Sequence, residues 1–452
     1  MDVPNVLNYI KVRQGLKGYK KKSSTFSQQT DDVDFLRNFK LFLDIMDYCY
    51  YQHYYVINKI NMKSYKFFAI LLCTLFLFGC NDSLFVSGGN DDEHKVDDGI
   101  VLKVYLENSG SMDGFMVNGS EFKDAVYDFI SEIGTCGVID TTELYFINSQ
   151  LIPFNKEVDD YVLHMNPMSF KNLGGNRQNS DLADVITKVV SNSDDETVSM
   201  LISDFIWDVP VGSLDMNSSK IRNAIKNQIN AQKDFTVFIM QLKSRFNKVH
   251  RPYYIWLFGC RTSLASILKK VQPQNIKHGL KDDNVAVFSP EGEVNWQLAS
   301  KKQSAEVKLS RDGTYNFSIN VSLDNTLQPN DFILSEDSYE FRRGERIELK
   351  GIVANTENNK YSHNLKLSVN KNFTTGTYEL ALKTNGMPEW VKDSNTNNPN
   401  DTAKTAGIQN LIQGVCDAYK DVKYVTSVVF VLSKSKSGEK KEHKSNKLEK
   451  DN

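Results

Sequence analysis

Short apolar runs alternate with amphipathic stretches between residues 100 and 271, and this alternation constrains the fold more than any other feature. Residues 100–106 (IVLKVYL) and 197–203 (TVSMLIS) are continuous apolar runs of the kind found in buried strands. Residues 121–133 place their apolar side chains at helical spacing. Apolar strands separated by amphipathic helices predict a mostly parallel sheet covered on both faces, so we expect a doubly wound α/β domain over residues 99–275. Further strands are expected at 143–148, 151–154, 235–242 and 253–258, and further helices at 181–190, 219–233 and 262–271.

A different pattern begins near residue 301, where polar and apolar residues alternate along short segments separated by turn signals such as Arg311-Asp312-Gly313. This pattern predicts a C-terminal antiparallel β-sandwich-like domain over residues 301–433, with a late helix at 407–419 and a last strand at 424–432. Residues 276–300 are expected to be a linker, and 434–452 a basic disordered tail.

Oxygen-bearing side chains gather in the loops where ligands of α/β sheets bind, at the carboxyl ends of the strands. Residues 107–114 (ENSGSMDG) follow the first strand, residues 174–181 (GGNRQNSD) precede the middle helix, and Ser203-Asp204 ends a buried strand. Carboxylate and hydroxyl oxygens, with little His or Cys nearby, suit a hard cation such as Mg²⁺ or Ca²⁺. The sequence therefore predicts a cation site at this edge.

The arrangement of these loops resembles a von Willebrand factor A (vWA-like) domain, a Rossmann-like α/β fold that carries a metal-ion-dependent adhesion site. That site has an Asp-x-Ser-x-Ser turn after the first strand, a Thr in a middle loop and an Asp after a later apolar strand. The resemblance covers about residues 100–270. The positions that match the metal ligands are Glu107, Ser109 and Ser111 in the first turn, Ser180 or Asp181 for the Thr, and Asp204 for the last Asp.

The resemblance implies binding of a protein partner, with Mg²⁺, Mn²⁺ or Ca²⁺ held by these residues and an acidic side chain of the partner completing the coordination. The sequence departs from the family's pattern at three positions. Glu107 stands where the family has Asp, Ser180 replaces Thr, and Phe205 follows Asp204 where many members have Gly, which would restrict access to the loop. The alternative interpretation is a metal-free site whose serines cap the first helix and whose acids are solvated.

The sequence contains no motif that requires an enzyme. We find no G-x-S-x-G, Walker A, G-x-G-x-x-G after a strand, H-E-x-x-H or EF-hand loop. We therefore expect no catalytic residues and no small-molecule substrate. A Mg²⁺-dependent hydrolase that uses Glu107 or Asp204 as its base remains the enzymatic alternative.

Charge argues against nucleic acid as a partner. The chain has 54 Lys and Arg against 56 Asp and Glu, so its formal net charge is -2 and it lacks the global basic field that collects nucleic acid.

A targeting signal begins at Met62, where Lys63 and Lys66 precede a twelve-residue apolar run, residues 67–78, that is followed by Gly79-Cys80. Twelve residues are too few to span a bilayer, which needs about 20. The end of the run resembles the lipobox of bacterial lipoproteins, which implies a signal peptide over residues 62–79 and acylation of Cys80, for example by palmitate. Residues 1–61 are interpreted as an extension of the gene model.

Residues 80–98 form a polar, acidic stretch that we interpret as a tether. Acidic residues soon after the lipidated Cys resemble the surface-export signals of Bacteroidetes lipoproteins. Together these features predict a lipoprotein of the bacterial cell envelope, anchored through its N-terminal lipid at the outer membrane or cell surface. A vWA-like domain that binds a protein partner is the leading hypothesis for its function, and a metal-free scaffold or assembly lipoprotein is the principal alternative.

Overall fold

The computed structural model describes residues 99–435, apart from 118–119, 179–180, 208–213, 277–283, 299–302, 345, 356–359 and 399–400. All of these residues belong to one compact unit, His94–Asn452. Several predicted segments lie outside the described residues: the extension, the signal peptide, the whole tether with Cys80, Ser180, nearly all of the tail and parts of the linker. Within the described part of the chain, no helix is long and apolar enough to cross a membrane.

A seven-stranded sheet forms the centre of the N-terminal part, with the strand order β3-β2-β1-β4-β6-β5-β7. Strand β1 pairs in parallel with both β2 and β4, and every other neighbouring pair is antiparallel. The strands are β1 (Ile100–Glu107), β2 (Ile139–Ile147), β3 (Leu151–Phe154), β4 (Thr197–Ser203), β5 (Phe235–Phe246), β6 (Val249–Cys260) and β7 (Val285–Phe288).

The sheet is mixed, whereas the sequence pattern predicted a mostly parallel one. Strands β5 and β6 form a hairpin in which Phe246 pairs with Val249, so only Asn247 and Lys248 connect them. Asn247 has φ 54°, a left-handed conformation that Asn tolerates in tight turns. Two residues allow only antiparallel pairing, because a parallel connection needs a crossover of a dozen or more residues.

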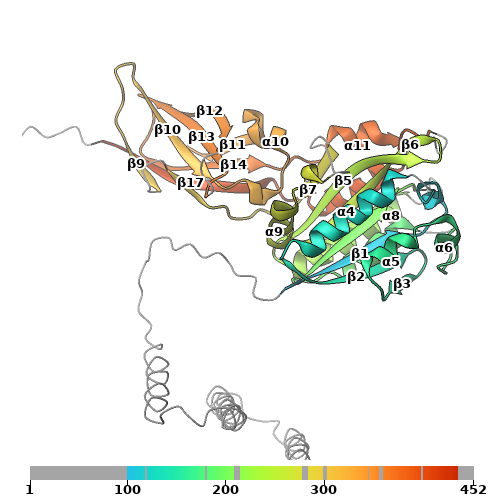
Figure 1. Ribbon diagram of the computed structural model, residues 1–452. Helices are drawn as coiled ribbons and strands as arrows, with labels where there is room; N and C mark the ends of the chain where they lie inside the picture. Colours follow the sequence, from blue (N-terminus) through green and yellow to red (C-terminus); the bar gives the residue numbers. More distant parts are fainter. Residues whose placement is uncertain are drawn as a thin grey trace, which may run out of the picture. The chain divides into compact units, whose positions relative to one another are not determined.

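Helices cover both faces of this sheet and define two hydrophobic clusters (Figure 1). Helix α4 (Glu121–Thr135) and helix α9 (Arg261–Val271) pack on one face, and α7 (Leu182–Ser191) and α8 (Leu214–Ala231) pack on the other. Helix α4 begins after Ser120, whose Oγ accepts the Phe122 backbone N–H at 3.2 Å. Shorter elements on the α4 side are η1 (Ser111–Phe115), α5 (Val158–Leu163), α6 (Pro167–Lys171) and η3 (Pro273–Asn275).

The late helix predicted near residues 407–419 packs on the α/β sheet rather than on the C-terminal strands. Helix α12 (Ile408–Ala418) lies against α8, where Ser218 Oγ donates to the Asn410 carbonyl at 2.8 Å. Just beyond the helix, Tyr419 Oη donates to the Phe235 carbonyl at 2.7 Å. The segment before it supplies α11 (Glu389–Ser394), β15 (Asn395–Thr396) and β16 (Thr405–Ala406).

Two four-stranded sheets form the C-terminal part and share one hydrophobic cluster between them. Phe430 of one sheet meets Phe317 of the other with ring centroids 5.9 Å apart. All pairings are antiparallel except that of β9 with β17, so the predicted β-rich C-terminal region is confirmed. One sheet contains β12 (Ile347–Ala354), β13 (His363–Asn370), β10 (Thr314–Val321) and β8 (Trp296–Leu298), and the other contains β11 (Tyr339–Arg343), β14 (Gly376–Lys383), β17 (Tyr424–Lys434) and β9 (Ser304–Val307). The connections include η5 (Asp324–Thr326), α10 (Asn330–Leu334) and η6 (Glu336–Ser338).

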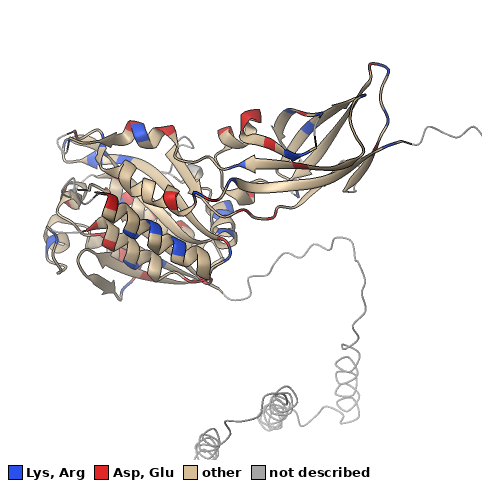
Figure 2. Ribbon diagram, turned by 180° about the vertical axis from the view of Figure 1, so that it is seen from behind, with Lys and Arg blue, Asp and Glu red and all other residues tan. Residues whose placement is uncertain are grey.

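Acidic and basic residues are interspersed along the helices and strands in the ribbon of Figure 2. Mixed charge of this kind is ordinary for a protein surface and favours solubility. A field of one sign therefore does not indicate a partner, and local groups of side chains are the more informative feature.

Candidate functional site

The first turn after β1 lies at the sheet edge where three parallel strands end. Strands β2, β1 and β4 run in the same direction, so their carboxyl ends meet at one edge. The Asn108 backbone N–H donates to the Ile147 carbonyl at 2.7 Å, which ties the turn to the end of β2. Asn108 is fully buried, and Ser109 is only 7% exposed. The turn is thus part of the packed structure rather than a free loop.

Three of the predicted site residues are brought together by hydrogen bonds. Ser109 Oγ and Ser111 Oγ lie 2.8 Å apart, and Ser111 Oγ donates to Asp204 Oδ1 at 3.1 Å. Asp204 follows β4 directly, 93 residues after Ser111 in the chain. The predicted meeting of the first turn with the end of the later strand is therefore present in the structure.

The carboxylate of Asp204 is almost completely buried, and only one of its two oxygens has hydrogen-bond partners. Its side chain is 1% exposed, and Oδ1 also accepts the Ile206 backbone N–H at 3.1 Å. Oδ2 has no hydrogen-bond partner. Burial raises the pKa of Asp204 to about 6, while the hydrogen bonds from Ile206 and Ser111 and the charge of Arg251 act in the opposite direction. An unpaired buried oxygen of this kind is a position where a ligand or cation would be stabilised.

Glu107 lies at the same edge and is 2% exposed. Its Oε2 accepts a hydrogen bond from Ser203 Oγ at 2.7 Å, and Ser203 Oγ in turn accepts the Phe205 backbone N–H at 2.8 Å. The Glu107 carboxylate is therefore bonded to the residue that precedes Asp204. Glu has one methylene more than Asp, which lets the Glu107 carboxylate extend from β1 to Ser203 at the end of β4.

Asp181, the other middle-loop candidate, has a structural role in the described chain. It is the N-cap of α7, where its Oδ1 accepts the Ala183 backbone N–H at 3.0 Å. Its Oδ2 pairs with Lys220 Nζ of α8 at 3.3 Å. Among the described residues, none of its hydrogen bonds reaches Ser109, Ser111 or Asp204. Ser180 lies outside the described residues.

Arg177 connects the middle loop to the first turn, although no sequence pattern predicted it as a site residue. Its Nε donates to Asn108 Oδ1 at 2.8 Å, and its Nη2 donates to the Ser109 carbonyl at 3.0 Å and pairs with Asp113. Its own carbonyl accepts the Gly110 backbone N–H at 3.1 Å. No spacing rule marks this Arg, because its partners are an amide, a backbone and a carboxylate oxygen that lie 64 to 69 residues earlier.

The glycines of the middle loop allow it to lie against the end of β2. Gly175 has φ 71°, and the position of a side chain there is occupied by the Asn148 side chain. Asn148 Nδ2 donates to the Gly174 carbonyl at 2.9 Å. Because the middle loop lies this close to the end of β2, Arg177 of the same loop is within hydrogen-bonding distance of the first turn.

Phe205 does not cover the turn, in contrast to the effect expected from a bulky residue after Asp204. Its ring is fully buried and stacks on Trp256, with ring centroids 4.6 Å apart. The ring belongs to the hydrophobic cluster shared with α7 and α8. Phe205 adopts φ 51°, the left-handed conformation that Gly adopts without strain.

The donors that meet here are carboxylates and hydroxyls, which suit Mg²⁺ better than Zn²⁺ or copper. Within the described ranges, no group of three or more His, Cys, Asp or Glu side chains is arranged to hold a metal ion. The candidate site therefore depends on hydroxyl oxygens of Ser109 and Ser111 beside the Asp204 carboxylate. The unpaired Oδ2 of Asp204 fits a cation, and the attachment of Glu107 to Ser203 reduces the number of acids free to face it.

Comparison of the chain with protein-family models, with curated proteins and with solved structures finds no match.

Proposed function

We propose that this chain is an envelope lipoprotein whose vWA-like domain binds a protein partner, with a divalent cation between Asp204 and an acidic side chain of that partner. Binding rather than catalysis is the proposed role. The N-terminal lipid on Cys80 would hold the protein at the membrane. The lipoprotein part of the proposal rests on the sequence of residues 62–80, and the partner-binding part rests on the edge of the sheet.

The buried carboxylate of Asp204 is the observation that carries the proposal. Removing a carboxylate from water is costly unless it is paired, and Asp204 Oδ2 has no partner. The hydroxyl groups of Ser109 and Ser111 lie beside it. A cation bound here would pair the carboxylate, and the two hydroxyls would act as ligands directly or through water. Mg²⁺ retains several waters in such sites, which leaves positions for a partner's carboxylate.

The metal-free scaffold is the second candidate, because protein groups already connect the three loops. Arg177 joins the middle loop to the first turn, and Ser111 joins the first turn to Asp204. Ser203 joins the end of β4 to Glu107. These bonds support a site that keeps its shape without a cation and contacts its partner through the same edge.

Thermal unfolding of the full chain in EDTA, and then with Mg²⁺, Mn²⁺ or Ca²⁺, separates the two candidates. A cation at about 100 times its dissociation constant adds about 2.7 kcal/mol to the free energy of unfolding, which raises the midpoint by a few degrees. We expect this rise in the unaltered chain and in Asp181→Asn, and its loss in Asp204→Ala. An unchanged midpoint with every cation at millimolar concentration would leave the metal-free scaffold, and a rise that persists in Asp204→Ala would place the cation elsewhere.

A further inference from the structure

The β5–β6 hairpin continues past both of the strands that flank it. Strand β7 pairs with β5 only at residues 237–240, and β4 pairs with β6 only at residues 254–258. Within the described sheet, residues 243–251 therefore pair only with one another. We call residues 243–251 the hairpin tip, which lies near the label β6 in Figure 1.

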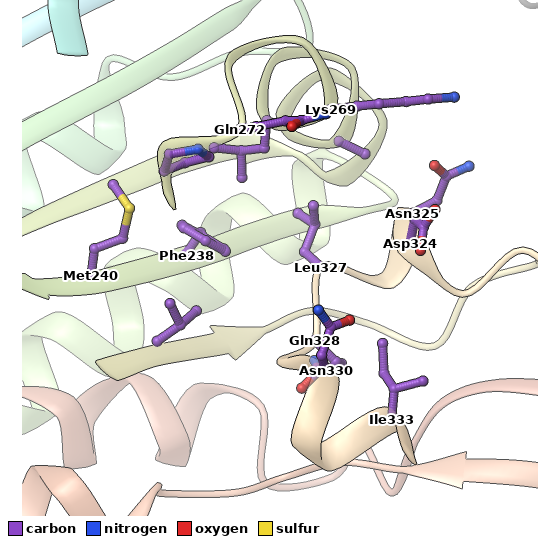
Figure 3. Close-up of a pocket in the computed structure, with 14 residues that line it drawn as sticks. Phe238, Met240, Lys269, Gln272, Asp324, Asn325, Leu327, Gln328, Asn330 and Ile333 are labelled. Carbon is purple, nitrogen blue, oxygen red and sulfur yellow. The ribbon is translucent and has the colours of Figure 1, made fainter. Parts of the chain in front are cut away.

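The base of the hairpin is fixed in the core of the α/β sheet. Phe238 and Met240 of β5 belong to the cluster on the α4 side, and they line a cavity of about 350 Å³ together with residues of α9 and α10 (Figure 3). Val237 and Ile239 belong to the cluster on the opposite face. The strands that carry the tip are therefore held from both faces.

The tip itself is attached to the sheet edge that carries the candidate site. The Asn247 backbone N–H donates to the Gly114 carbonyl of η1 at 3.1 Å. The Phe246 ring meets the Phe115 ring edge-on, with centroids 5.0 Å apart, and the Arg251 guanidinium lies over the other side of the packing at 4.2 Å from the Phe246 centroid. The tip therefore has a defined position beside the first turn.

Positive charge without a partner gathers at this tip. Lys243, Arg245 and Lys248 are exposed, and residues 235–281 contain no Asp or Glu. In the described part of the chain, none of the three forms an ion pair. Asp113 of the neighbouring η1 is already paired with two other cations. The tip thus offers three cations to a ligand outside the fold.

The spacing of these cations suits an extended polypeptide. Lys243 and Arg245 are two residues apart on β5, so their side chains leave the same face of the hairpin about 7 Å apart. An extended segment with Asp or Glu at every second position presents its carboxylates at the same interval. Because the tip is held in place, little conformational freedom is lost when such a segment binds.

Other polyanions fit the tip less well. Nucleic-acid sites commonly neutralise about 6 to 10 phosphates, and polybasic membrane sites contain about 4 to 8 Lys or Arg, whereas the tip exposes three cations. Among the tip residues, all of which the structure describes, Val249 is the one exposed large apolar side chain. A single valine gives little apolar area for insertion into a bilayer.

We propose that the hairpin tip binds an extended acidic segment of the protein partner. This inference rests on the proposed binding of a partner at the same sheet edge, and it adds the chemistry of the partner's surface. Lys243, Arg245 and Lys248 pair with carboxylates of the segment. The contact needs no cation, so it also applies if the site is metal-free.

Four probes of defined charge test the assignment on the full chain in EDTA. They are a fluorescent (Glu-Thr)₅ peptide, the neutral (Gln-Thr)₅ peptide, a thymidine hexanucleotide with five phosphates, and phosphatidylglycerol vesicles. We expect (Glu-Thr)₅ to bind about tenfold more tightly than (Gln-Thr)₅ in fluorescence anisotropy, and to lose this advantage as salt rises from about 0.05 to 0.3 M. Equal binding of the two peptides would overturn the proposal. Binding of the hexanucleotide or the vesicles as tight as that of (Glu-Thr)₅ would also overturn the assignment to a polypeptide.

Two variants with equal loss of charge assign the binding to the tip. The test variant replaces the tip cations: Lys243→Gln, Arg245→Gln and Lys248→Gln. The control replaces exposed lysines elsewhere: Lys269→Gln, Lys270→Gln and Lys308→Gln. The test variant should bind (Glu-Thr)₅ about tenfold more weakly, with an unchanged unfolding midpoint because the replaced side chains are exposed, and the control should bind normally. Equal affinities of the two variants would contradict the proposal.

The outcome for the tip can be separated from the outcome for the cation. Asp204→Ala should bind (Glu-Thr)₅ in EDTA as the unaltered chain does, although it should lose the cation-dependent rise in the unfolding midpoint. Failure of the peptide to bind, with that rise intact, would overturn the role of the tip alone. Peptide binding without any cation-dependent rise would support the tip and overturn the cation bridge.

Discussion

Asp204 is an ionisable residue that the fold buries almost completely, although burial disfavours the charged form of its carboxyl group. Its carboxyl group is buried next to Ser111, and its pKa is raised from 3.8 to about 6. Between pH 3.8 and about 6, the Asp204 carboxyl group therefore keeps its proton in the folded state and loses it in the unfolded chain. By linkage, the stabilising contribution is fully present below pH 3.8 and is lost as the pH rises through about 6.

Replacing Asp204 by Asn should remove this pH dependence. In EDTA, the free energy of unfolding of the unaltered chain should lose about 3 kcal/mol in total from this group as the pH rises from below 3.8 to above about 6, the equivalent of a shift of about two pKa units. Asp204→Asn keeps the size of the side chain and should flatten that part of the profile. Urea unfolding at a series of pH values measures it, with Asp181→Asn as the control. A slope that is identical in both variants would show that other groups cause it.

At Phe205, we expect the Gly variant to be more stable than the Ala variant, which is the reverse of the usual order. Its φ of 51° costs a non-Gly residue about 1–2 kcal/mol, whereas Gly adopts it freely. Both Phe205→Ala and Phe205→Gly lose the contact with Trp256 and should destabilise the fold by about 3–5 kcal/mol. We expect Phe205→Gly to be about 1 kcal/mol more stable than Phe205→Ala in chemical denaturation. The normal order, with Ala more stable, would mean that the backbone relaxes at this position.

At the scale of elements, the contact between α12 and α8 decides how the α/β sheet is covered. Gly414 of α12 is buried against α8, and a Cβ at this position would lie 2.7 Å from the Ser218 carbonyl oxygen and 3.1 Å from Ile221 Cβ. The two helices approach this closely because Gly414 has no side chain. A glycine inside a helix costs about 1 kcal/mol relative to Ala, so its presence here indicates a packing requirement.

Gly414→Ala should therefore destabilise the protein even though Ala favours the helix. The overpacking should cost about 1–3 kcal/mol, more than the gain in helix propensity. Gln413→Ala, on the exposed side of the same helix, gains propensity without a clash and should change stability by less than about 0.5 kcal/mol. Thermal unfolding of the two variants makes the comparison. An increase in stability for Gly414→Ala would show that α12 moves away from α8 at little cost.

At the scale of the whole molecule, the C-terminal segment completes the core of the N-terminal part. Val391 of α11 and five α12 residues belong to the cluster that also contains Tyr254 and Trp256 of β6. Tyr254 Oη donates to Thr405 Oγ1 at 3.1 Å. The α/β sheet is thus covered on one face by a segment that follows most of the C-terminal strands in the chain.

A fragment that ends at residue 300 should therefore not fold cooperatively. It would leave the cluster around Trp256 exposed to water, because α11 and α12 would be missing. The fragment covering residues 99–435 should unfold in a cooperative transition. Scanning calorimetry and binding of a hydrophobic dye compare the two. A sharp, cooperative transition of the shorter fragment would show that the sheet needs no cover from the C-terminal segment.

Many of the local elements, and the sheet edge that carries the candidate site, could be predicted from the sequence. Helix periodicity located α4, α8 and α9, and the rule that ligands bind at the carboxyl ends of strands selected Ser109, Ser111 and Asp204. These features depend on residues close together in the chain or on one strand, where periodicity and turn chemistry are sufficient. The antiparallel pairing of β6 with β4 and β5 was not predicted. Only two residues connect β5 to β6, and so short a turn gives little sequence signal.

The groups that complete the candidate site and the core come together only in the folded chain. Arg177 joins the first turn through oxygens that lie 64 to 69 positions away, and α12 packs on a helix some 190 residues earlier. Asp181 pairs with Lys220 and caps the start of α7, and Glu107 accepts a hydrogen bond from Ser203. Such pairings follow from the simultaneous burial of apolar faces and the hydrogen bonding of every buried polar group, two conditions that are met only when the whole chain is packed.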